Sequence, residues 1–228
     1  MLNRSHPILC LVTDRQRLCA ACDDESSGTC LTAQVREAVA AGIDLVQIRE
    51  RTMEGRRLAD LVASAVAAAR GSATRIVVND RLDIASACGA HGVHLRGDSI
   101  PPSAARSMLP RDVLLGRSVH DAAEAVQVAP DVDYLIAGPV FSTPSKPGAD
   151  RLLGETGLAG LVRAVAVPVL AIGGVTVDRL PRVAAAGAAG VAAIGLFLND
   201  GPAAPCRAGP LHEVVEAARA AFDRPRVV

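Results

Sequence analysis

The chain has 228 residues, a length that suits one large α/β domain, and its 24 Lys and Arg residues balance its 24 Asp and Glu residues to a formal net charge of +0. This balance disfavours bulk attraction to nucleic acid or to a membrane, so we expect a small-molecule partner. Hydrophobic residues make up 50% of the chain but aromatic residues only 2%. The core must therefore consist of Ala, Val, Leu and Ile, and base stacking on aromatic side chains is not expected.

The apolar run near the N-terminus is too short for a signal sequence or a membrane span, and polar or glycine residues interrupt every later run. We therefore expect a cytoplasmic protein whose six cysteines are reduced thiols. The spacing of Cys19, Cys22 and Cys30 suggests a metal or redox site, but no His lies near them and no second C-x-x-C motif follows. We interpret this segment as a polar loop with incidental cysteines.

Eight short apolar runs alternate with Ala-rich segments of helical periodicity, which is typical of parallel strands covered by helices. These units predict a single TIM (β/α)8 barrel over residues 1–228, with a doubly wound α/β fold as the alternative. The predicted strands are 8–13, 45–48, 76–78, 92–95, 113–116, 134–137, 169–172 and 191–194. The predicted helices are 32–40, 56–69, 81–88, 102–108, 120–128, 156–166, 177–186 and 211–222.

The junctions between the helices and strands contain a repeated glycine. Gly42, Gly89 and Gly187 each stand where a helix would end in the left-handed conformation, shortly before a buried strand. Two segments fall outside this pattern, a polar insertion at about 19–30 and a C-terminal tail that we expect to be flexible.

Two successive predicted strands, the seventh and the eighth, end in glycine-containing turns. Gly173 and Gly174 follow the first of them, and Ile194 and Gly195 end the second. In a barrel the loops after the last two strands commonly bind phosphate, because glycine lets backbone N–H groups approach the anion. The sequence therefore predicts a phosphate site at this end of the barrel.

The second strand carries long polar side chains in the alternation Q-x-R-x-R. This spacing places Gln47, Arg49 and Arg51 on one face of the strand. Inside a barrel such charges are costly unless an anion meets them, either a ligand or an internal carboxylate such as Glu50 or Asp14. We favour the ligand, because the charges stand at the end where barrel enzymes bind substrate.

Further polar residues follow the remaining strands. His120 is either an acid and base or a surface residue, whereas His94 lies within its strand and is predicted to be a hydrogen-bonded core residue. The loop GPVFSTPSKPG adds Thr143, Ser145 and Lys146. These cations and hydroxyls, together with the glycines, predict a substrate that bears one or more phosphates.

Eight blocks of the chain, taken in order, carry a recognisable pattern. They are LCLVTD (9–14), LVQIRER (45–51), VVNDRLDIA (77–85), HGVHLRGDSIP (91–101), GRSVH (116–120), DYLIAGPVFSTPSKPG (133–148), PVLAIGGV (168–175) and AGVAAIG (189–195). These blocks resemble the thiamine phosphate synthase and thiazole tautomerase family. The resemblance implies a TIM barrel that acts in thiamine biosynthesis. It places a thiazole phosphate at the glycine turns, with Thr143, Ser145 and Lys146 over the site. Gln47, Arg51 and Asn79 are further candidates for substrate binding.

The resemblance leads to two activities. The synthase joins a pyrimidine diphosphate to the thiazole phosphate and releases pyrophosphate with Mg²⁺, which needs carboxylates to hold the metal. The tautomerase moves a proton to aromatise a carboxythiazole phosphate, which needs a placed acid and base and no metal.

The chain departs from the synthase pattern after the fourth predicted strand. There the synthase pattern reads G-Q-[DE]-D, and its last Asp holds the metal together with the Asp of N-D. This chain has Asp80 in N-D, but Ser99 takes the second ligand position, Arg96 brings a cation close by, and Asp98 is displaced by one residue. Arg51 also stands where synthases usually carry Lys.

We therefore expect a thiazole tautomerase without a cofactor, in which His120 is the catalytic acid and base and Arg49 binds the substrate carboxylate. One alternative is a thiamine phosphate synthase, with Asp80 and Asp98 holding Mg²⁺ and a pyrimidine diphosphate as second substrate. Another is a non-catalytic barrel that binds a thiamine precursor. The sequence leaves open whether the chain forms a homo-oligomer.

Overall fold

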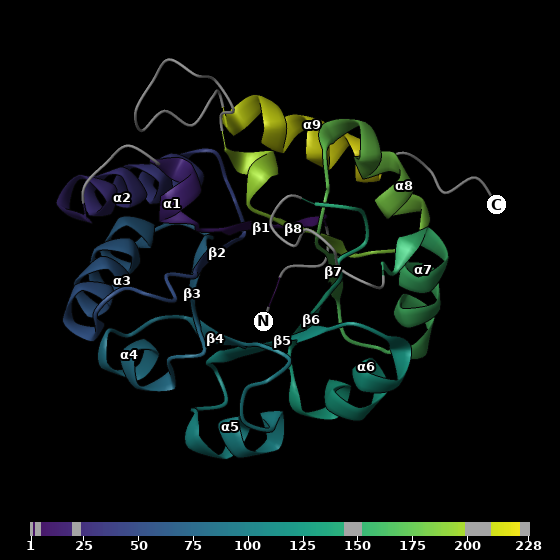
Figure 1. The fold of residues 1–228 in the computed structure, drawn as a ribbon, viewed down its shortest axis with the longest axis horizontal. Helices are drawn as coiled ribbons and strands as arrows, with labels where there is room; N and C mark the ends of the chain where they lie inside the picture. Colours follow the sequence, from purple (N-terminus) through teal and green to yellow (C-terminus); the bar gives the residue numbers. More distant parts are fainter. Residues whose placement is uncertain (1, 3–5, 20–23, 144–151, 199–210, 224–228) are drawn as a thin grey trace.

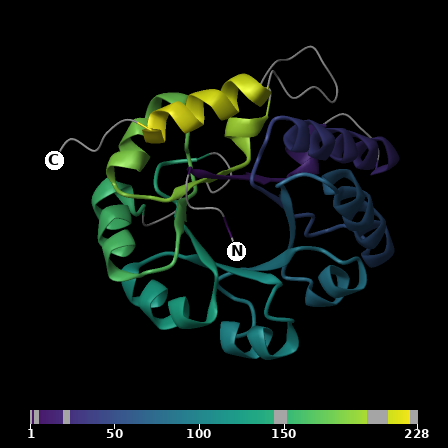
Figure 2. The same ribbon diagram turned by 180° about the vertical axis from the view of Figure 1, so that it is seen from behind.

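The computed structural model describes the chain except for residues 1, 3–5, 20–23, 144–151, 199–210 and 224–228. Eight parallel strands form a closed barrel in sequence order, and β1 pairs with both β2 and β8. Helices surround the strands on the outside (Figures 1 and 2). The predicted TIM barrel is confirmed, and the doubly wound alternative is excluded by this closure.

Every predicted strand overlaps an observed one. The strands are β1 (Ile8–Val12), β2 (Leu45–Ile48), β3 (Arg75–Asn79), β4 (Gly92–Leu95), β5 (Leu114–Val119), β6 (Tyr134–Ala137), β7 (Val169–Ala171) and β8 (Gly190–Ala193). β5 continues past its predicted end at 116 because its last residues pair with β6 as far as Val119 and Ala137.

The helices cover the outer face of the barrel. They are α1 (Arg15–Leu18), α2 (Asp24–Ala40), α3 (Gly55–Ala69), α4 (Leu82–Ala87), α5 (Pro102–Met108), α6 (Ala122–Val128), α7 (Gly154–Ala164), α8 (Leu180–Ala185) and α9 (Leu211–Asp223). The described residues also include the short 3-10 helices η1 (Ala129–Asp131), η2 (Val177–Arg179) and η3 (Gly195–Phe197). Gly42, Gly89 and Gly187 have φ angles of 76°, 65° and 85°, which confirms the predicted left-handed helix ends. Among the described residues, no helix is long and apolar enough to cross a membrane.

The segment at about 19–30, which was predicted to be a polar insertion, is partly helical in the structure. Helix α2 already begins at Asp24, so residues 24–30 are helical. Ser27 and Cys30 are buried although their surroundings in the sequence are polar, which explains why composition alone indicated a loop. The predicted flexible tail includes residues 224–228, which lie outside the described residues.

The cysteines also differ in part from their prediction. Cys19 and Cys30 are disulfide-bonded, so the expectation of reduced thiols is wrong for these two residues. Cys10 and Cys88 are free thiols, as expected. The expectation rested on the lack of an export signal, which says nothing of the local geometry that brings two sulfur atoms together. Cys22 and Cys206 lie outside the described residues.

The core has two layers, because the strands of a parallel barrel are buried on both faces. The larger layer lies between the strands and the helices. Helix α3, for example, buries one apolar face made of Leu58, Leu61, Val62, Ala65 and Ala69. The smaller layer fills the inside of the barrel and consists of Ile8, Cys10, Val12, Leu45, Val77, Leu114, Tyr134, Ile136, Leu170 and Ala192.

The single tyrosine of the chain lies inside the barrel, where a glycine leaves room for it. Tyr134 is fully buried and stands beside Gly116 in the register of β5 and β6. A Cβ atom added at Gly116 would lie 2.6 Å from Tyr134 Cε1. The ring therefore packs directly on the glycine backbone, in a core that is as tightly packed as a crystal.

We expect Gly116→Ala to lower the free energy of unfolding by about 1–3 kcal/mol, because the Tyr134 ring must move to admit the new methyl group. Chemical denaturation of the purified variant measures this change. The control is Gly160→Ala in α7, where an added Cβ atom meets nothing within 4 Å. That substitution should be neutral or stabilise by about 0.5–1 kcal/mol. Equal losses in the two variants would contradict the role of Gly116.

Candidate active site at the carboxyl ends of the strands

A buried carboxylate fixes the ends of β1 and β2. Glu50 accepts a hydrogen bond of 2.7 Å from Thr13 Oγ1, and Arg15 Nε lies 3.7 Å from Glu50 Oε2. Thr13 Oγ1 also accepts a 2.9 Å hydrogen bond from the backbone N–H of Arg49. Burial raises the pKa of Glu50, and the hydrogen bond from Thr13 partly offsets this shift. The backbone that presents Arg49 is therefore held in place by groups outside the site.

Arg49 is half-buried and has no internal carboxylate as a partner. Within the described residues, its guanidinium makes no ion pair or hydrogen bond. Glu50 instead pairs with Arg15, and Asp14 accepts a 3.2 Å hydrogen bond from the N–H of Arg17 at the start of α1. The internal ion pairs that were the alternative to a ligand are thus absent from the described part of the chain. The guanidinium is therefore available to bind an anion.

The side chains nearest to Arg49 on the same strand face differ in exposure. Gln47 is buried and donates a 3.1 Å hydrogen bond to Asn79 Oδ1 on β3, so the two predicted substrate-binding amides contact each other. Arg51 is exposed, in the turn that leads to α3.

His94 is a buried histidine inside the barrel, as predicted. Its Nε2 lies 2.8 Å from Ser118 Oγ and its Nδ1 lies 3.3 Å from the hydroxyl of Tyr134. Burial, and to a lesser degree the charge of Arg117, lowers the pKa of His94 to about 3. The imidazole is therefore neutral at cellular pH, and its role is to form hydrogen bonds inside the barrel.

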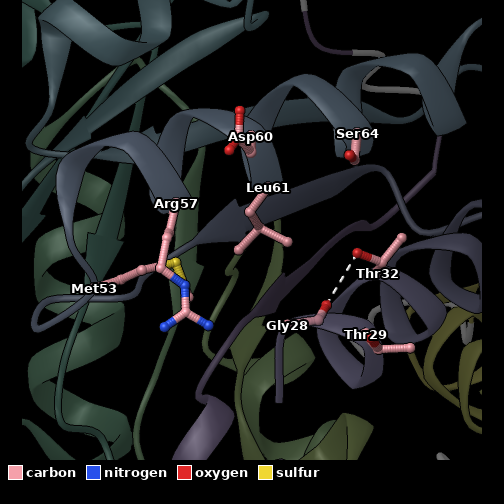
Figure 3. A pocket seen from close by; sticks show the side chains of 8 residues that line it. All are labelled: Gly28, Thr29, Thr32, Met53, Arg57, Asp60, Leu61 and Ser64. Atoms are coloured by element: carbon pink, nitrogen blue, oxygen red, sulfur yellow. Dashed lines mark hydrogen bonds between the residues drawn. The ribbon is translucent and has the colours of Figure 1, made fainter. Parts of the chain in front are cut away.

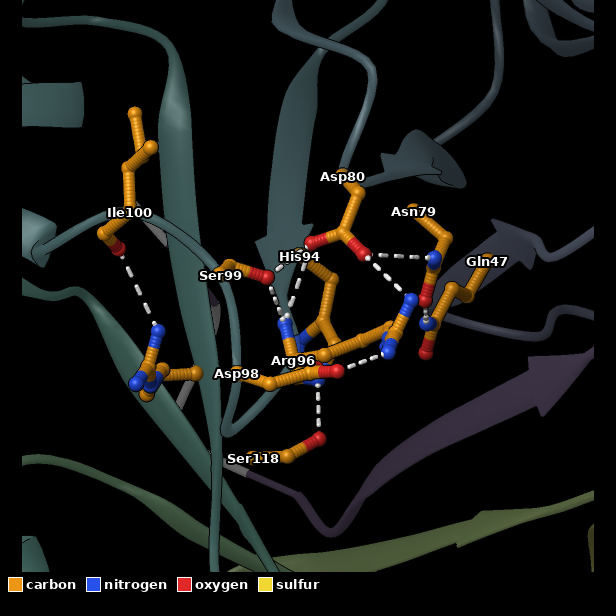
Figure 4. Close-up of polar contacts among 10 residues, drawn as sticks. Gln47, Asn79, Asp80, His94, Arg96, Asp98, Ser99, Ile100 and Ser118 are labelled. Atoms are coloured by element: carbon orange, nitrogen blue, oxygen red, sulfur yellow. Dashed lines mark hydrogen bonds and ion pairs between the residues drawn. The ribbon is translucent and has the colours of Figure 1, made fainter. Parts of the chain in front are cut away.

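Asp80 is the centre of a polar cluster at the ends of β3 and β4 (Figure 4). Its Oδ1 accepts hydrogen bonds from the Ser99 hydroxyl and, at 3.2 Å, from the N–H of Arg96. Its Oδ2 lies 3.4 Å from Arg96 Nη1 and accepts a 3.4 Å hydrogen bond from Asn79. Asp80 also has a positive φ of 59°, which is rare for a residue with a side chain.

The Arg96 guanidinium joins two carboxylates. Its Nη2 forms an ion pair with Asp98 while its Nη1 faces Asp80. The side chain of Asp98 is 69% exposed, whereas that of Asp80 is 25% exposed. The bond to Asp80 therefore lies in the better shielded part of the cluster.

Arg117 holds the loop that carries this cluster. It is buried, and its guanidinium donates hydrogen bonds of 2.7 Å to the carbonyl of Gly97 and of 3.3 Å to the carbonyl of Ile100. The sequence alone did not indicate this role for Arg117. The loop from 96 to 100 is fixed by side-chain bonds to its backbone, so the positions of Asp98 and Ser99 are part of the fold.

His120 lies just beyond β5, next to the same loop. A Cβ atom added at Gly97 would lie 3.3 Å from His120 Cε1. The imidazole is half exposed, and its Nδ1 lies 3.4 Å from Glu124 Oε2. A carboxylate on one ring nitrogen leaves the other nitrogen to face a substrate, which suits a proton shuttle.

The predicted phosphate site follows β7 and β8. Gly173 and Gly174 have φ angles of 96° and 61°, a conformation that favours glycine. Among the described residues, neither of their N–H groups has a hydrogen-bond acceptor. Ile194 packs against the interior cluster, and Gly195 begins η3, where the first N–H groups have no partner within the helix. These backbone donors can bind an anion.

Two arginines that sequence reasoning did not assign to the site stand beside these glycines. Arg179 Nη1 donates a 2.7 Å hydrogen bond to the carbonyl of Gly174, and its guanidinium lies 5.0 Å from the centre of the Phe141 ring. Arg17 Nη2 would lie 3.3 Å from a Cβ atom added at Gly195. Arg179 thus braces the turn, and Arg17 adds positive charge next to it.

The loop after β6 is described only at its beginning. Thr143 is half-buried. Ser145 and Lys146, the other two residues predicted there, lie outside the described residues.

A shallow pocket of about 290 Å³ lies elsewhere, between α2 and α3 on the outside of the barrel (Figure 3). Thr32, Asp60, Leu61 and Ser64 are among its lining residues. None of the predicted site residues lines it, so it has no part in the site at the strand ends.

The Mg²⁺ ion that a synthase of this resemblance implies does not fit the described residues. Mg²⁺ requires oxygen ligands in an octahedron at about 2.0–2.1 Å. Arg96 pairs with both carboxylates that were candidates for the metal, Asp80 and Asp98.

Comparison with known proteins identifies the family of this barrel. Residues 9–197 match the family model described as thiamine monophosphate synthase. The chain belongs to this family. It is 38% identical over 219 residues to the thiamine-phosphate synthase of Azorhizobium caulinodans, with 94% of each chain covered. It is also 38% identical over 192 residues to the thiamine-phosphate synthase of Methanoregula boonei, with 84% of this chain and 88% of the relative covered.

A solved structure of the family has the same fold. The thiamine phosphate pyrophosphorylase from Pyrococcus furiosus superposes with a TM-score of 0.77 at 29% identity, and 96% of each chain is covered. The chain is thus an enzyme of thiamine biosynthesis by family. The names of the relatives favour the synthase, which the sequence placed second, and do not support the tautomerase branch that it placed first.

The buried histidine predicts a loss of stability in acid. In the unfolded chain, His94 has the ordinary pKa of 6.5 and is protonated below that pH, whereas folded His94 is protonated only near pH 3. The unfolded state therefore binds more protons between these values, and the free energy of unfolding falls as the pH falls from 6.5 towards 3. We expect His94→Gln, which does not titrate, to lose less stability than the wild type between about pH 7 and about pH 4.5. Urea unfolding at both pH values measures the difference. His212→Gln changes an exposed histidine of α9 and is the control. An acid loss in His94→Gln as large as in the wild type would refute this role.

We predict that a side chain added in the turn after β7 lowers the affinity for phosphate. A Cβ atom at Gly174 would lie 2.9 Å from Phe141 Cβ and overlap the Ser142 carbonyl. Gly174→Ala should therefore displace the N–H donors and weaken binding of inorganic phosphate about tenfold or more, as measured by calorimetry. Gly187→Ala places a Cβ atom on a glycine with a φ of 85° at the end of a helix and should leave phosphate binding intact. The prediction is wrong if both variants bind phosphate alike.

Proposed function

We propose that the chain is a thiamine-phosphate synthase, which joins a pyrimidine diphosphate to a thiazole phosphate and releases pyrophosphate. The observation that carries the proposal is similarity over nearly the whole chain, since the Azorhizobium synthase is 38% identical with 94% of each chain covered. The two substrates carry two separate anionic groups. The site has matching groups in two places, at the glycine turns and at the ends of β2 and β4.

The glycine turns after β7 and β8 bind the thiazole phosphate. The N–H groups of Gly173 and Gly174 supply hydrogen bonds without a side chain in the way, and Arg17 and Arg179 supply positive charge beside them. Backbone donors in a positively charged turn are a common way to hold a phosphate. The family resemblance also assigns Thr143, Ser145 and Lys146 to the binding of this phosphate.

The cations at the ends of β2 and β4 bind the diphosphate. Arg49 is half-buried without a carboxylate partner in the described part of the chain, and Arg51 stands two residues further along. Gln47 positions the organic part of the substrate through its Oε1 atom, which makes no hydrogen bond to the described residues. Asn79 holds the Gln47 amide in place and is itself bonded to Asp80. As the bond between the pyrimidine carbon and the diphosphate oxygen breaks, its electron pair stays on the diphosphate, and nearby guanidinium groups stabilise that charge. The thiazole ring supplies the electron pair of the new bond.

A second candidate function is the thiazole tautomerase, which one observation favours. His120 stands at the end of β5 with one ring nitrogen beside Glu124 and with half of its side chain exposed. In this reaction His120 moves the proton and Arg49 binds the carboxylate of the substrate. The phosphate occupies the same glycine turns in both reactions.

The two functions are distinguished by a parallel assay of the purified chain. One arm supplies the pyrimidine diphosphate and the thiazole phosphate, and the other supplies the carboxythiazole phosphate. We expect product in the first arm, and a loss of about a hundredfold or more in Arg49→Gln because an essential charge is removed. Turnover in the second arm alone, lowered about a hundredfold by His120→Asn, would replace the synthase by the tautomerase. Binding without turnover in either arm would refute both enzymes in favour of the thiamine-precursor-binding barrel.

A further inference from the structure

Arg96 is placed where a divalent cation would have to bind. The guanidinium lies between the Asp80 and Asp98 carboxylates, with Nη1 at 3.4 Å from Asp80 Oδ2 and Nη2 paired with Asp98 (Figure 4). A metal ion at this position would meet a fixed positive charge at close range. Both carboxylates that were candidates for the metal already contact the arginine.

The groups around Asp80 also engage both oxygens of its carboxylate. Its Oδ1 accepts from the Ser99 hydroxyl and from the Arg96 N–H, and its Oδ2 accepts from Asn79 as well as facing the guanidinium. The Arg96 N–H also donates a 2.8 Å hydrogen bond to Ser99 Oγ. An aspartate in place of Ser99 could be a ligand, whereas the neutral hydroxyl is a hydrogen-bond donor to Asp80.

The guanidinium of Arg96 has N–H donors left over to bind a substrate. An arginine has five N–H donors in one plane, and the two contacts with Asp80 and Asp98 use one at Nη1 and one at Nη2. The side chain is 34% exposed, so the remaining donors can reach a ligand. The pair with Asp98 is mostly in water and is therefore weak, whereas the contact with Asp80 is better shielded. Arg96 can exchange Asp98 for a diphosphate while Asp80 continues to hold it.

We infer that Arg96 supplies, within the chain, the positive charge that a divalent metal ion would supply, so that the enzyme binds the diphosphate directly and works without a metal. This inference rests on the proposed synthase function. Arg96 acts on the diphosphate as the bond to the pyrimidine carbon breaks and the electron pair remains on the diphosphate oxygen. Arg117 fixes the loop through Gly97 and Ile100 and so keeps Arg96 in position.

Direct binding of pyrophosphate tests the inference without any turnover. Calorimetry in EDTA should show that the wild type binds pyrophosphate and that Arg96→Gln binds it about tenfold more weakly or worse, because charged hydrogen bonds are lost. The matched control is Arg81→Gln, since the Arg81 guanidinium also pairs with an aspartate two residues further on, Asp83, and among the described residues its ion pair and side-chain hydrogen bonds involve neither Asp80 nor Asp98. That variant should bind pyrophosphate like the wild type. Equal affinity in wild type and Arg96→Gln overturns the inference.

Metal binding gives a second readout. Mn²⁺, used as a paramagnetic probe and followed by electron paramagnetic resonance, should not bind to the cluster in the wild type. The double variant Arg96→Gly/Ser99→Asp removes the internal cation, adds a carboxylate, and should bind Mn²⁺. Mn²⁺ binding to the wild type that Asp80→Asn abolishes would overturn the inference.

The activity assay separates this inference from the proposed function. Synthase turnover that persists in EDTA supports both. Turnover that EDTA abolishes and Mg²⁺ restores keeps the synthase and overturns the role of Arg96. If no synthase turnover is seen with or without Mg²⁺, the proposed function fails, while binding of pyrophosphate in EDTA that depends on Arg96 still establishes the anion site.

Discussion

Closure of eight parallel strands is the constraint on which the site depends. Because every strand runs in the same direction around the ring, all the carboxyl ends meet at one rim. Residues as far apart in sequence as Arg49 and Gly174 therefore share one end of the molecule. Closure itself depends on close packing inside the barrel, where Gly116 leaves space for the ring of Tyr134. The packing of the interior and the chemistry of the rim are thus parts of one arrangement.

At the rim, buried contacts hold the loops in place while the guanidinium of Arg49 has no ion-pair partner in the described part of the chain. Glu50, Thr13 and Arg15 satisfy one another beneath the rim, and Arg117 bonds to the backbone of the loop after β4. Because Glu50 is already bound to Thr13 and Arg15, it does not pair with Arg49. Arg49 is thus available for a substrate. A binding site placed on rigid elements in this way loses little entropy when the ligand arrives.

The fold could be predicted from the sequence because its signals are local. Apolar runs of strand length and glycines such as Gly42 at helix ends recur often enough to count the units. The start of α2 could not be found in this way, because the acidic and serine-rich residues 24–27 look like a loop until the burial of Ser27 is known. Nor could the disulfide bonding of Cys19 and Cys30, which depends on the spatial approach of sulfur atoms.

The candidate site was predictable in outline, since polar residues after each strand identify the rim. The sequence also showed Arg96 beside Asp80 and Asp98, but only the structure shows that one guanidinium contacts both. A cation that belongs to the chain cannot be chelated, diluted or exchanged for calcium or manganese. On the inference drawn above, the positive charge at this rim does not depend on the magnesium concentration around the enzyme.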